Sequence, residues 1–225
     1  MFVAFEGIDG SGKGTQARML AERLQAVGTT CQVIAFPRYG ETRFGRAISD
    51  YLNGAYGDLH SVHPVLASVL YAGDRFESRE LLQSAAARNA VVILDRFTAS
   101  NVAHQAAKLP EPERPAFIQW ITGIEHDVFG MPHPDVTVLL DIEPELAQRR
   151  VSGKAPRGYT HATHDLHESD RAYLAEVRRV YLQLAEREPN WYVVAATDGE
   201  GRPRSPDQIA ARIWDILVSH RRTGG

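Results

Sequence analysis

Short runs of apolar residues recur along the chain and alternate with segments in which apolar residues return every three or four positions. A short, unbroken apolar run is typical of a strand that helices cover on both faces. Five such runs lie at 2–5, 32–36, 90–94, 136–142 and 191–195. The periodic segments predict helices at 13–27, 65–88, 113–129, 144–151, 167–187 and 206–221.

Strands that alternate with helices indicate an α/β fold, here a five-stranded parallel sheet with helices on both faces. The sequence contains no linker, internal repeat or low-complexity tract, and 225 residues can bury one sizeable core. We therefore expect a single domain over 1–225. The segment 152–166, SGKAPRGYTHATHDL, is Gly-rich, basic and aperiodic, which predicts a mobile lid within that domain.

Composition excludes some classes of function without selecting one. The formal net charge is -3, which gives no general attraction to nucleic acid or to an anionic membrane. No apolar run approaches the roughly 18 residues of a membrane span, and no signal-peptide pattern is present. Cys31 stands alone, so an internal disulfide is excluded and a reducing compartment fits. We expect a cytoplasmic protein without a nucleic-acid or membrane partner.

The most specific local pattern is GIDGSGKGTQ at 7–16, between the first apolar run and the first helix. Glycines let backbone N–H groups turn inward around an anion, and the following helix directs its positive N-terminal end to the same point. This predicts the phosphate loop of a P-loop nucleoside triphosphate hydrolase-like fold; a Gly-rich turn with a chance lysine is the alternative. The expected nucleotide-binding residues are Gly7, Gly10, Ser11, Gly12, Lys13, Gly14 and Thr15.

Gly14 departs from the usual pattern G-x-x-x-x-G-K-[ST], in which a hydroxyl at this position holds magnesium. Thr15 offers a hydroxyl one residue later, and magnesium keeps several waters in most protein sites. We therefore expect a nucleotide whose magnesium the protein holds loosely. The variant GKGT resembles nucleoside monophosphate kinases more than GTPases, and no N-K-x-D segment for guanine occurs.

Three further polar clusters belong to the predicted acceptor side. ILDRFTASNVAHQ at 93–105 places Asp95 and Arg96 directly after a strand, at the edge of the sheet where ligands bind in open α/β folds. Arg96 is suited to clamp a phosphate while Asp95 orients it or a magnesium water; a simple ion pair is the alternative. FPRY at 36–39 and YAGDR at 71–75 are each unremarkable alone.

Together and in this order, the clusters make the chain strongly resemble the thymidylate kinase family, whose members phosphorylate dTMP to dTDP with ATP. The resemblance covers nearly the whole length through FEGIDGSGKGTQ, FPRY, YAGDR, DRFTASNVAHQ, VTVLLDIEPELAQRR and RAYLAEVRRVYLQLA. It implies ATP and Mg²⁺ as cofactors, dTMP as the acceptor in dTTP biosynthesis, and a homodimer. It also implies in-line phosphoryl transfer with arginine charge stabilisation.

The resemblance assigns roles around the acceptor phosphate and the sugar. Asp9 would lie near the deoxyribose 3′-hydroxyl and the magnesium, Arg38 and Arg96 would hold the dTMP phosphate, and Tyr39 would line the sugar. Together with Thr15 of the loop and Asp95 of the strand end, this makes the expected metal ligands Asp9, Thr15 and Asp95.

The remaining implied contacts are to the base. Tyr71 would stack on thymine where the family commonly has Phe, since both rings offer a π-face. Arg75 and Asn101 would read the thymine edge, with Gln105 nearby. His104 would lie near the sugar at a position that is often Tyr.

Positive charge must accompany the transferred phosphoryl group, whereas no strong general base is required because a phosphate is already a nucleophile. Some family members carry this charge as an arginine where this chain has Gly10, and others supply the arginine from the lid. Gly10 therefore indicates that the arginine comes from the lid. We expect Arg149 at the nucleotide and Arg157 in the catalytic set, with Lys154 or Arg150 as alternatives to Arg157. That catalytic set is Asp9, Lys13, Arg96 and Arg157.

Two other functions stay open. Another nucleoside monophosphate kinase or a deoxynucleoside kinase would share the fold and differ in its acceptor pocket. A nucleotide-binding switch would lack that pocket, so the pair Arg38 and Arg96 counts against it. The histidines of HATHDLH at 161–167 fit a solvated loop better than a metal site, because zinc needs a rigid ligand set.

Overall fold

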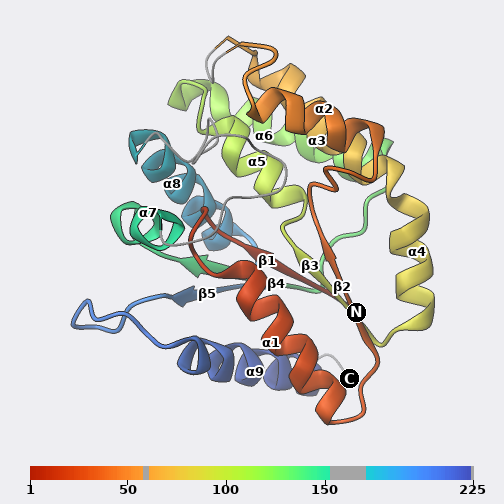
Figure 1. The fold of residues 1–225 in the computed structure, drawn as a ribbon, viewed down its shortest axis with the longest axis vertical. Helices are drawn as coiled ribbons and strands as arrows, with labels where there is room; N and C mark the ends of the chain where they lie inside the picture. Colours follow the sequence, from red (N-terminus) through yellow and green to blue (C-terminus); the bar gives the residue numbers. More distant parts are fainter. Residues whose placement is uncertain (58–60, 153–170, 224–225) are drawn as a thin grey trace.

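Five strands form one sheet in which all neighbours run parallel (Figure 1). The computed structural model describes residues 1–57, 61–152 and 171–223. Its strands are β1 (Phe2–Glu6), β2 (Cys31–Ala35), β3 (Val91–Asp95), β4 (Val136–Asp141) and β5 (Trp191–Ala195), in the order β2-β3-β1-β4-β5. The predicted fold class is confirmed, and every strand boundary lies close to its predicted run.

Helices connect the strands and cover the sheet. They are α1 (Lys13–Ala26), α2 (Arg43–Leu52), α3 (Pro64–Glu77), α4 (Arg79–Arg88), α5 (Thr98–Ala106), α6 (Arg114–Gly123), α7 (Pro144–Ser152), α8 (Arg171–Arg187) and α9 (Pro206–Thr223). A 3₁₀ turn, Glu111–Glu113, precedes α6, and a π-helical turn, η2 (Ile124–Val128), continues it.

The helices differ from the prediction in three places. The single helix expected over 65–88 is two helices that meet at Ser78, whose hydroxyl donates to the carbonyl of Asp74 at 2.8 Å. Such a bond to the carbonyl four residues back weakens and bends a helix. The short helix α2 was not predicted. Neither was α5, because eight of its nine residues are buried and a helix buried all round has no polar face to reveal its period.

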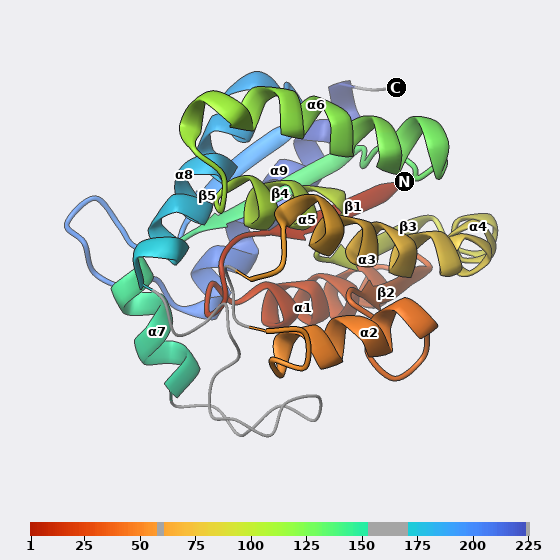
Figure 2. The ribbon, with the colours of Figure 1, turned by 90° about the horizontal axis from the view of Figure 1, so that it is seen from above.

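Alternate residues of each strand point to opposite faces of the sheet and build separate cores. Val3 and Phe5 of β1 pack with Leu24 of α1 and Ile213 of α9. Ala4, between them in sequence, packs on the other face in a cluster that includes residues of α4. Figures 1 and 2 show α1 and α9 on one side of the sheet and α4, α5 and α8 on the other.

The register between β1 and β3 determines where the loops after these strands meet. Phe5 pairs with Asp95, and the backbone N–H of Arg96 donates to the carbonyl of Phe5 at 3.0 Å. The glycine-rich loop after β1 therefore begins beside Arg96. This is the carboxyl edge of the sheet. The chain leaves β1 toward β2 on one side and leaves the neighbouring β3 toward β4 on the other, and open α/β sheets bind ligands at such a point.

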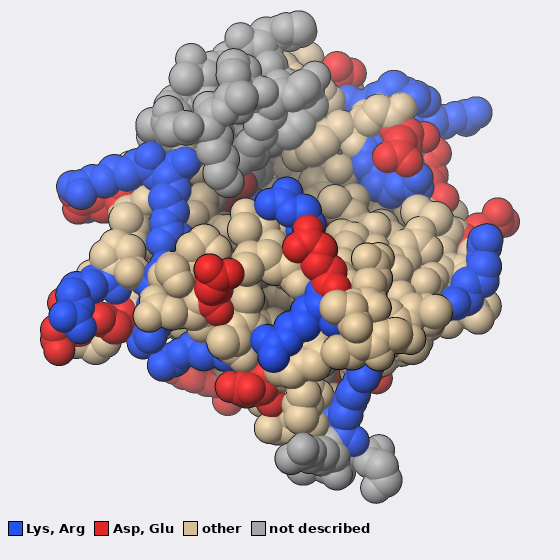
Figure 3. All heavy atoms as spheres, turned by 60° about the horizontal axis from the view of Figure 1, so that its bottom comes forward, with Lys and Arg blue, Asp and Glu red and all other residues tan. Residues whose placement is uncertain are grey.

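The described surface carries charges of both signs. Figure 3 shows Lys and Arg interspersed with Asp and Glu on the face that it draws, without a continuous field of one sign among the coloured residues. Within 1–57, 61–152 and 171–223, no helix combines the length and the apolarity that crossing a membrane requires.

Candidate active site

The loop between β1 and α1 takes a backbone path that depends on glycine. Gly7, Gly10 and Gly12 have φ angles of +135°, +84° and +100°. A Cβ at Gly7 would lie 2.6 Å from the carbonyl oxygen of Leu140, and one at Gly10 would lie 2.3 Å from that of Ala147. Space and backbone conformation thus both require glycine at these two positions.

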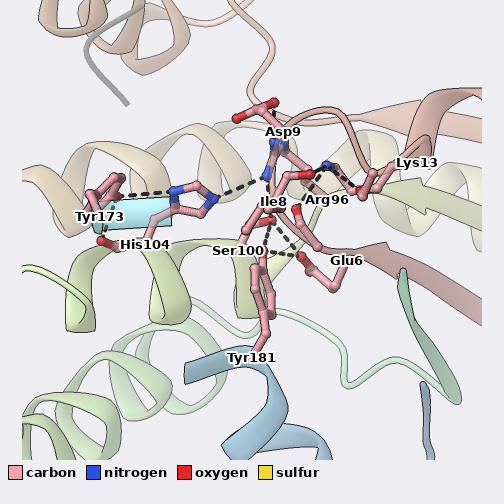
Figure 4. Close-up of polar contacts among 11 residues, drawn as sticks. Glu6, Ile8, Asp9, Lys13, Arg96, Ser100, His104, Tyr173 and Tyr181 are labelled. Atoms are coloured by element: carbon pink, nitrogen blue, oxygen red, sulfur yellow. Dashed lines mark hydrogen bonds and ion pairs between the residues drawn. The ribbon is translucent and has the colours of Figure 1, made fainter. Parts of the chain in front are cut away.

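Lys13 is the first residue of α1, and its ammonium group bends back over the loop. The Nζ atom donates to the carbonyls of Gly7 and Ile8, both at 2.9 Å, and to Ser11 Oγ at 3.3 Å (Figure 4). Burial lowers the pKa of Lys13 to about 7, and the neighbouring Arg96 cation contributes to the same shift. A phosphate bound in the loop would oppose that shift, because an adjacent anion favours the charged lysine.

Arg96 lies beside this loop in a strained conformation. It has a φ of +67°, which no other non-glycine residue adopts in the described ranges. Its Nη2 donates to Asp9 Oδ1 at 2.7 Å and its Nη1 to Ser100 Oγ at 3.3 Å (Figure 4). Such backbone strain costs roughly 1–3 kcal/mol and persists where the surroundings fix it, which is frequent in active sites.

Glu6 provides much of that surrounding structure, and sequence reasoning missed it. This fully buried carboxylate accepts the backbone N–H of Phe97 at 2.8 Å, Ser100 Oγ at 2.6 Å and Tyr181 OH at 3.0 Å (Figure 4). Burial raises the pKa of Glu6, and these hydrogen bonds oppose the rise. Glu6 therefore fixes the backbone that follows Arg96. The signal in the sequence was a carboxylate at the end of an apolar run, directly before the first loop glycine.

Two adjoining clefts flank the glycine-rich loop. The first has a volume of about 440 Å³ and is lined by Asp9, Gly10, Gly12, Lys13, Gly14, Thr15, Arg18, Phe36, Tyr39, Asp95 and Arg96. The second, of about 320 Å³, is lined by Gly10, Ser11, Gly12, Thr15, Gln16, Arg150, Arg204, Pro206 and Ile209. The first cleft brings the predicted phosphate loop and the predicted acceptor strand end together. Arg150 and Arg204 line the second cleft, whereas Arg149 pairs with Glu145 at 2.9 Å on the exposed side of α7.

The first cleft offers oxygen donors of the kind that magnesium prefers. Asp9, Asp95 and Thr15 all line it. A Cβ at Gly14 would lie 2.9 Å from Asp95 Oδ2, so the missing side chain at this position makes room for the carboxylate. No group of three His, Cys, Asp or Glu residues suited to a metal gathers in the part of the chain that the structure describes. The donor set fits Mg²⁺ held by one or two carboxylates together with phosphates and water.

The predicted base-binding residues come from two helices that pack against each other, α3 with Tyr71 and Arg75 and α5 with Asn101, His104 and Gln105. Arg75 and Asn101 are each 2% exposed, and Gln105 is fully buried. Among the described residues, no hydrogen-bond partner reaches Asn101 Oδ1 or either amide atom of Gln105. Buried polar atoms of this kind are rare in proteins, so a ligand or an ordered water is expected to complete their hydrogen bonds.

The FPRY segment is fixed on α3 by a buried carboxylate. Asp74 accepts the backbone N–H of Arg38 at 3.0 Å and also a hydrogen bond from Thr42 Oγ1. The guanidinium of Arg38 donates to Ser78 Oγ at 3.1 Å and pairs with Glu41. The structure thus brings Tyr39 to the wall of the first cleft, while the Arg38 side chain lies against the start of α4.

The ring of His104 is neutral and has a defined tautomer. Tyr173 OH donates to the carbonyl of His104 at 2.9 Å, so it accepts from His104 Nδ1 at 3.2 Å (Figure 4). His104 Nε2 is then left as an acceptor that faces Arg96 Nη1 at 3.5 Å. Burial, with help from the Arg96 cation, lowers the pKa of His104 to about 3. His104 therefore supports Arg96 without adding a charge.

The predicted lid lies almost entirely outside the described residues. Lys154, Arg157 and the histidine-rich segment 161–167 all belong to the range 153–170. Their predicted roles stay predictions.

Comparison with known proteins agrees with this geometry. The sequence profile of the thymidylate kinase family matches residues 5–202. The chain is 37% identical to a thymidylate kinase of Mycobacterium tuberculosis over 204 residues, which is 90% of this chain and 94% of the relative. It is 33% identical over 218 residues to a thymidylate kinase of Caulobacter vibrioides, covering 96% of this chain and 95% of that protein.

A solved structure supports the fold. The thymidylate kinase of Candida albicans superimposes with a TM-score of 0.75 at 22% identity, over 98% of this chain and 92% of that one. Fold, family profile and sequence relatives agree over nearly the whole length, and the chain belongs to the thymidylate kinase family.

Proposed function

We propose that the chain moves the γ-phosphoryl group of ATP to dTMP by in-line displacement inside the 440 Å³ cleft, with Mg²⁺ and arginine side chains neutralising the charge. As a thymidylate kinase, the chain is an ATP-dependent phosphotransferase that acts on dTMP. The observation that carries the mechanism is that the Lys13 loop and the Asp95–Arg96 strand end line one cleft.

Positioning and charge neutralisation do the catalytic work in this proposal. Lys13 contacts the β- and γ-phosphates, and Arg96 holds the acceptor phosphate in line with the γ-phosphorus. Asp9 restricts the Arg96 guanidinium through the 2.7 Å ion pair, while Glu6 and His104 fix it from behind. The acceptor phosphate is already an anion, so no side chain has to remove a proton.

Magnesium would be held by Asp9 and Asp95, with Thr15 contributing its hydroxyl directly or through water. The chemistry it would supply there is positive charge that offsets the charge of the phosphates. The donor nucleotide would continue into the 320 Å³ cleft between the loop and α9, where Arg150 and Arg204 lie.

Thymidine would lie between α3 and α5. Tyr71 offers a face for the base, and Arg75 and Asn101 offer a donor and an acceptor to its edge. Arg75 donates to the C4 oxygen of thymine and has no acceptor for the amino group of cytosine. A site with an unpaired buried donor rejects the wrong ligand by roughly 10⁴-fold or more, whereas one missing methyl group changes selectivity by only about 10- to 200-fold.

A coupled assay with ATP and a panel of acceptors tests this assignment. We expect rapid turnover of dTMP, slower turnover of dUMP, and almost none of dCMP, AMP or free deoxynucleosides. Arg75→Ala should reduce the dTMP over dCMP preference and leave the KM for ATP unchanged. Equal activity on dCMP or AMP would contradict the base-reading roles and leave a broader monophosphate kinase.

The lowered pKa of Lys13 gives the donor site a dependence on pH. Phosphates that bind beside Lys13 should raise its pKa again, so binding of ADP and Mg²⁺ at pH 8 should take up a proton. Affinity should fall as pH rises above about 7, by at most about tenfold per pH unit. Calorimetry in buffers of different ionisation enthalpy measures the uptake.

Lys108 supplies a matched control for this measurement. Burial also lowers its pKa to about 7, and its Nζ donates to Tyr51 OH at 2.6 Å rather than lining the cleft. Lys108→Met should keep the proton uptake and Lys13→Met should lose it. The opposite pattern would assign the proton to Lys108.

A homodimer is the proposed assembly. Leu66, Phe76, Trp120 and Val128 are exposed by 65%, 41%, 38% and 65%, and they lie on α3, α6 and η2, which are in contact with one another. Large apolar side chains gathered on neighbouring elements favour an interface between subunits. Analytical ultracentrifugation should give twice the chain mass of 25.0 kDa; a single-chain mass at micromolar concentration would contradict the dimer.

A further inference from the structure

Glu125 is a carboxylate on the buried face of a helix. The residues that α6 buries are Arg114, Phe117 and Ile121, at spacings of three and four, and Glu125 in η2 continues that series with 0% exposure. A buried charge is costly unless it is paired and hydrogen-bonded, so its partners indicate its role. π-helical turns such as η2 are frequent at functional sites.

The partners of Glu125 are the two residues proposed to read the base. Arg75 Nε donates to Glu125 Oε2 at 2.9 Å, and Arg75 Nη2 pairs with Oε1. Asn101 Nδ2 donates to the same Oε1 at 2.9 Å. One carboxylate therefore ties a side chain of α3 to a side chain of α5.

These contacts determine which way the Asn101 amide points. Its Nδ2 donates both to Glu125 and to the backbone carbonyl of Ser68, at 3.0 Å, and neither partner can donate in return when Glu125 is ionised. The amide oxygen must then point the other way. Consistent with this, no donor among the described residues reaches Asn101 Oδ1.

The resulting pair has a defined hydrogen-bond pattern. Arg75 contributes only donors, and its Nη1 is not needed for the contacts with Glu125. Asn101 contributes an acceptor, Oδ1. Thymine presents the complementary edge, an acceptor at C4 and a donor at N3, whereas cytosine presents a donor at C4 and an acceptor at N3.

We propose that Glu125 is a positioning residue for base selection, which holds Arg75 and Asn101 as one donor and acceptor pair that accepts a 4-oxo pyrimidine and opposes a 4-amino pyrimidine. This inference rests on the proposed function, in which Arg75 and Asn101 contact the base. Glu125 itself acts through these two side chains.

Glu125→Gln tests the proposal. A glutamine at this position directs an N–H toward one of the two donors. The Asn101 amide then loses one of its two acceptors, and only the Ser68 carbonyl still opposes the turned amide that offers Nδ2 to N3 of cytosine. We expect the ratio of kcat/KM for dTMP over dCMP to fall by about 10- to 100-fold, the change that one hydrogen bond to a charged group accounts for. The ratio for dTMP over dUMP should not change, because uracil has the same edge as thymine.

The two ratios distinguish a positioning role of Glu125 from general damage to the pocket. A merely structural role would lower kcat/KM for dTMP, dUMP and dCMP together and leave both ratios at their wild-type values, which would overturn the proposal. Asp127→Asn, a loss of charge on an exposed residue of the same turn, is the matched control and should leave every ratio unchanged.

Two further variants complete the design. Asn101→Ala tests the pocket itself. If this variant leaves the dTMP over dCMP ratio unchanged, the base-reading part of the proposed function fails. If Asn101→Ala lowers the ratio and Glu125→Gln does not, only the role of Glu125 is overturned. Glu125→Asp keeps the buried charge pair but is too short to reach both partners. Glu125→Asp should also lower the dTMP over dCMP ratio, and it serves as the test if the Glu125→Gln protein does not fold.

Discussion

Lys13→Ala should leave a folded protein with almost no kinase activity. Among the described residues, the Lys13 ammonium donates hydrogen bonds only within the phosphate loop, to the carbonyls of Gly7 and Ile8 and the hydroxyl of Ser11. The apolar core of α1, built by residues such as Leu20 and Leu24, is untouched by the change. Removing one preorganised contact to developing charge costs about 10²- to 10³-fold in kcat, and we expect at least that loss.

A control on the same helix makes this result specific. Glu22 has 67% of its side chain exposed and pairs only loosely with Arg18, at 4.0 Å. Glu22→Ala should therefore keep wild-type kcat and the same melting temperature. Near wild-type turnover in Lys13→Ala would mean that the loop does not hold the transferred phosphate.

The strands and the phosphate loop could be predicted because their signals are local. An apolar run such as 90–94 predicts a strand buried on both faces without reference to any other part of the chain. The loop glycines follow the same logic, since Gly7 and Gly10 are required by their own φ angles and by a carbonyl within 2.6 Å of each missing Cβ.

Other elements escaped prediction because the period of apolar residues does not show their cause. The helix α5 has no polar face, since α3, α6 and α8 pack against it and eight of its nine residues are buried. The break at Ser78 depends on one hydroxyl bonding to the carbonyl of Asp74, a local contact that involves no apolar residue.

In the candidate site, too, residues with a local signal were predicted and residues whose role depends on distant partners were missed. Residues inside motifs, such as Lys13 and Arg96, lie at the cleft as predicted. The supporting carboxylates Glu6 and Glu125 were missed. Glu6 ends an apolar run and Glu125 continues the buried series of α6, and the role of each depends on partners 94 and 50 residues away in sequence. A carboxylate at a position where the pattern predicts burial is thus a usable signal, since it must find a cation or several donors.

Arg157→Ala should reduce kcat by roughly 10³- to 10⁵-fold, the effect of a transition-state arginine in phosphoryl transfer, with a much smaller change in the KM for dTMP. The structure supports the premise at Gly10, the loop position that carries an arginine in some relatives. With a φ of +84° and only 2.3 Å between a Cβ at this position and the Ala147 oxygen, the loop cannot accept a side chain without moving. We therefore propose that the transition-state arginine comes from outside this loop, with the lid as its source.

Gly10→Arg in the Arg157→Ala background extends the test. Because an arginine at this position would have to displace the backbone of α7, we expect it not to restore turnover, as single-turnover phosphoryl transfer can measure. Recovery of activity would show that the loop adapts and that Gly10 does not determine where the arginine comes from. If Arg157→Ala changes only the KM, Arg157 is a binding residue. If it changes neither kcat nor the KM, the catalytic role passes to Lys154 or Arg150. Of these two, Arg150 lines the second cleft.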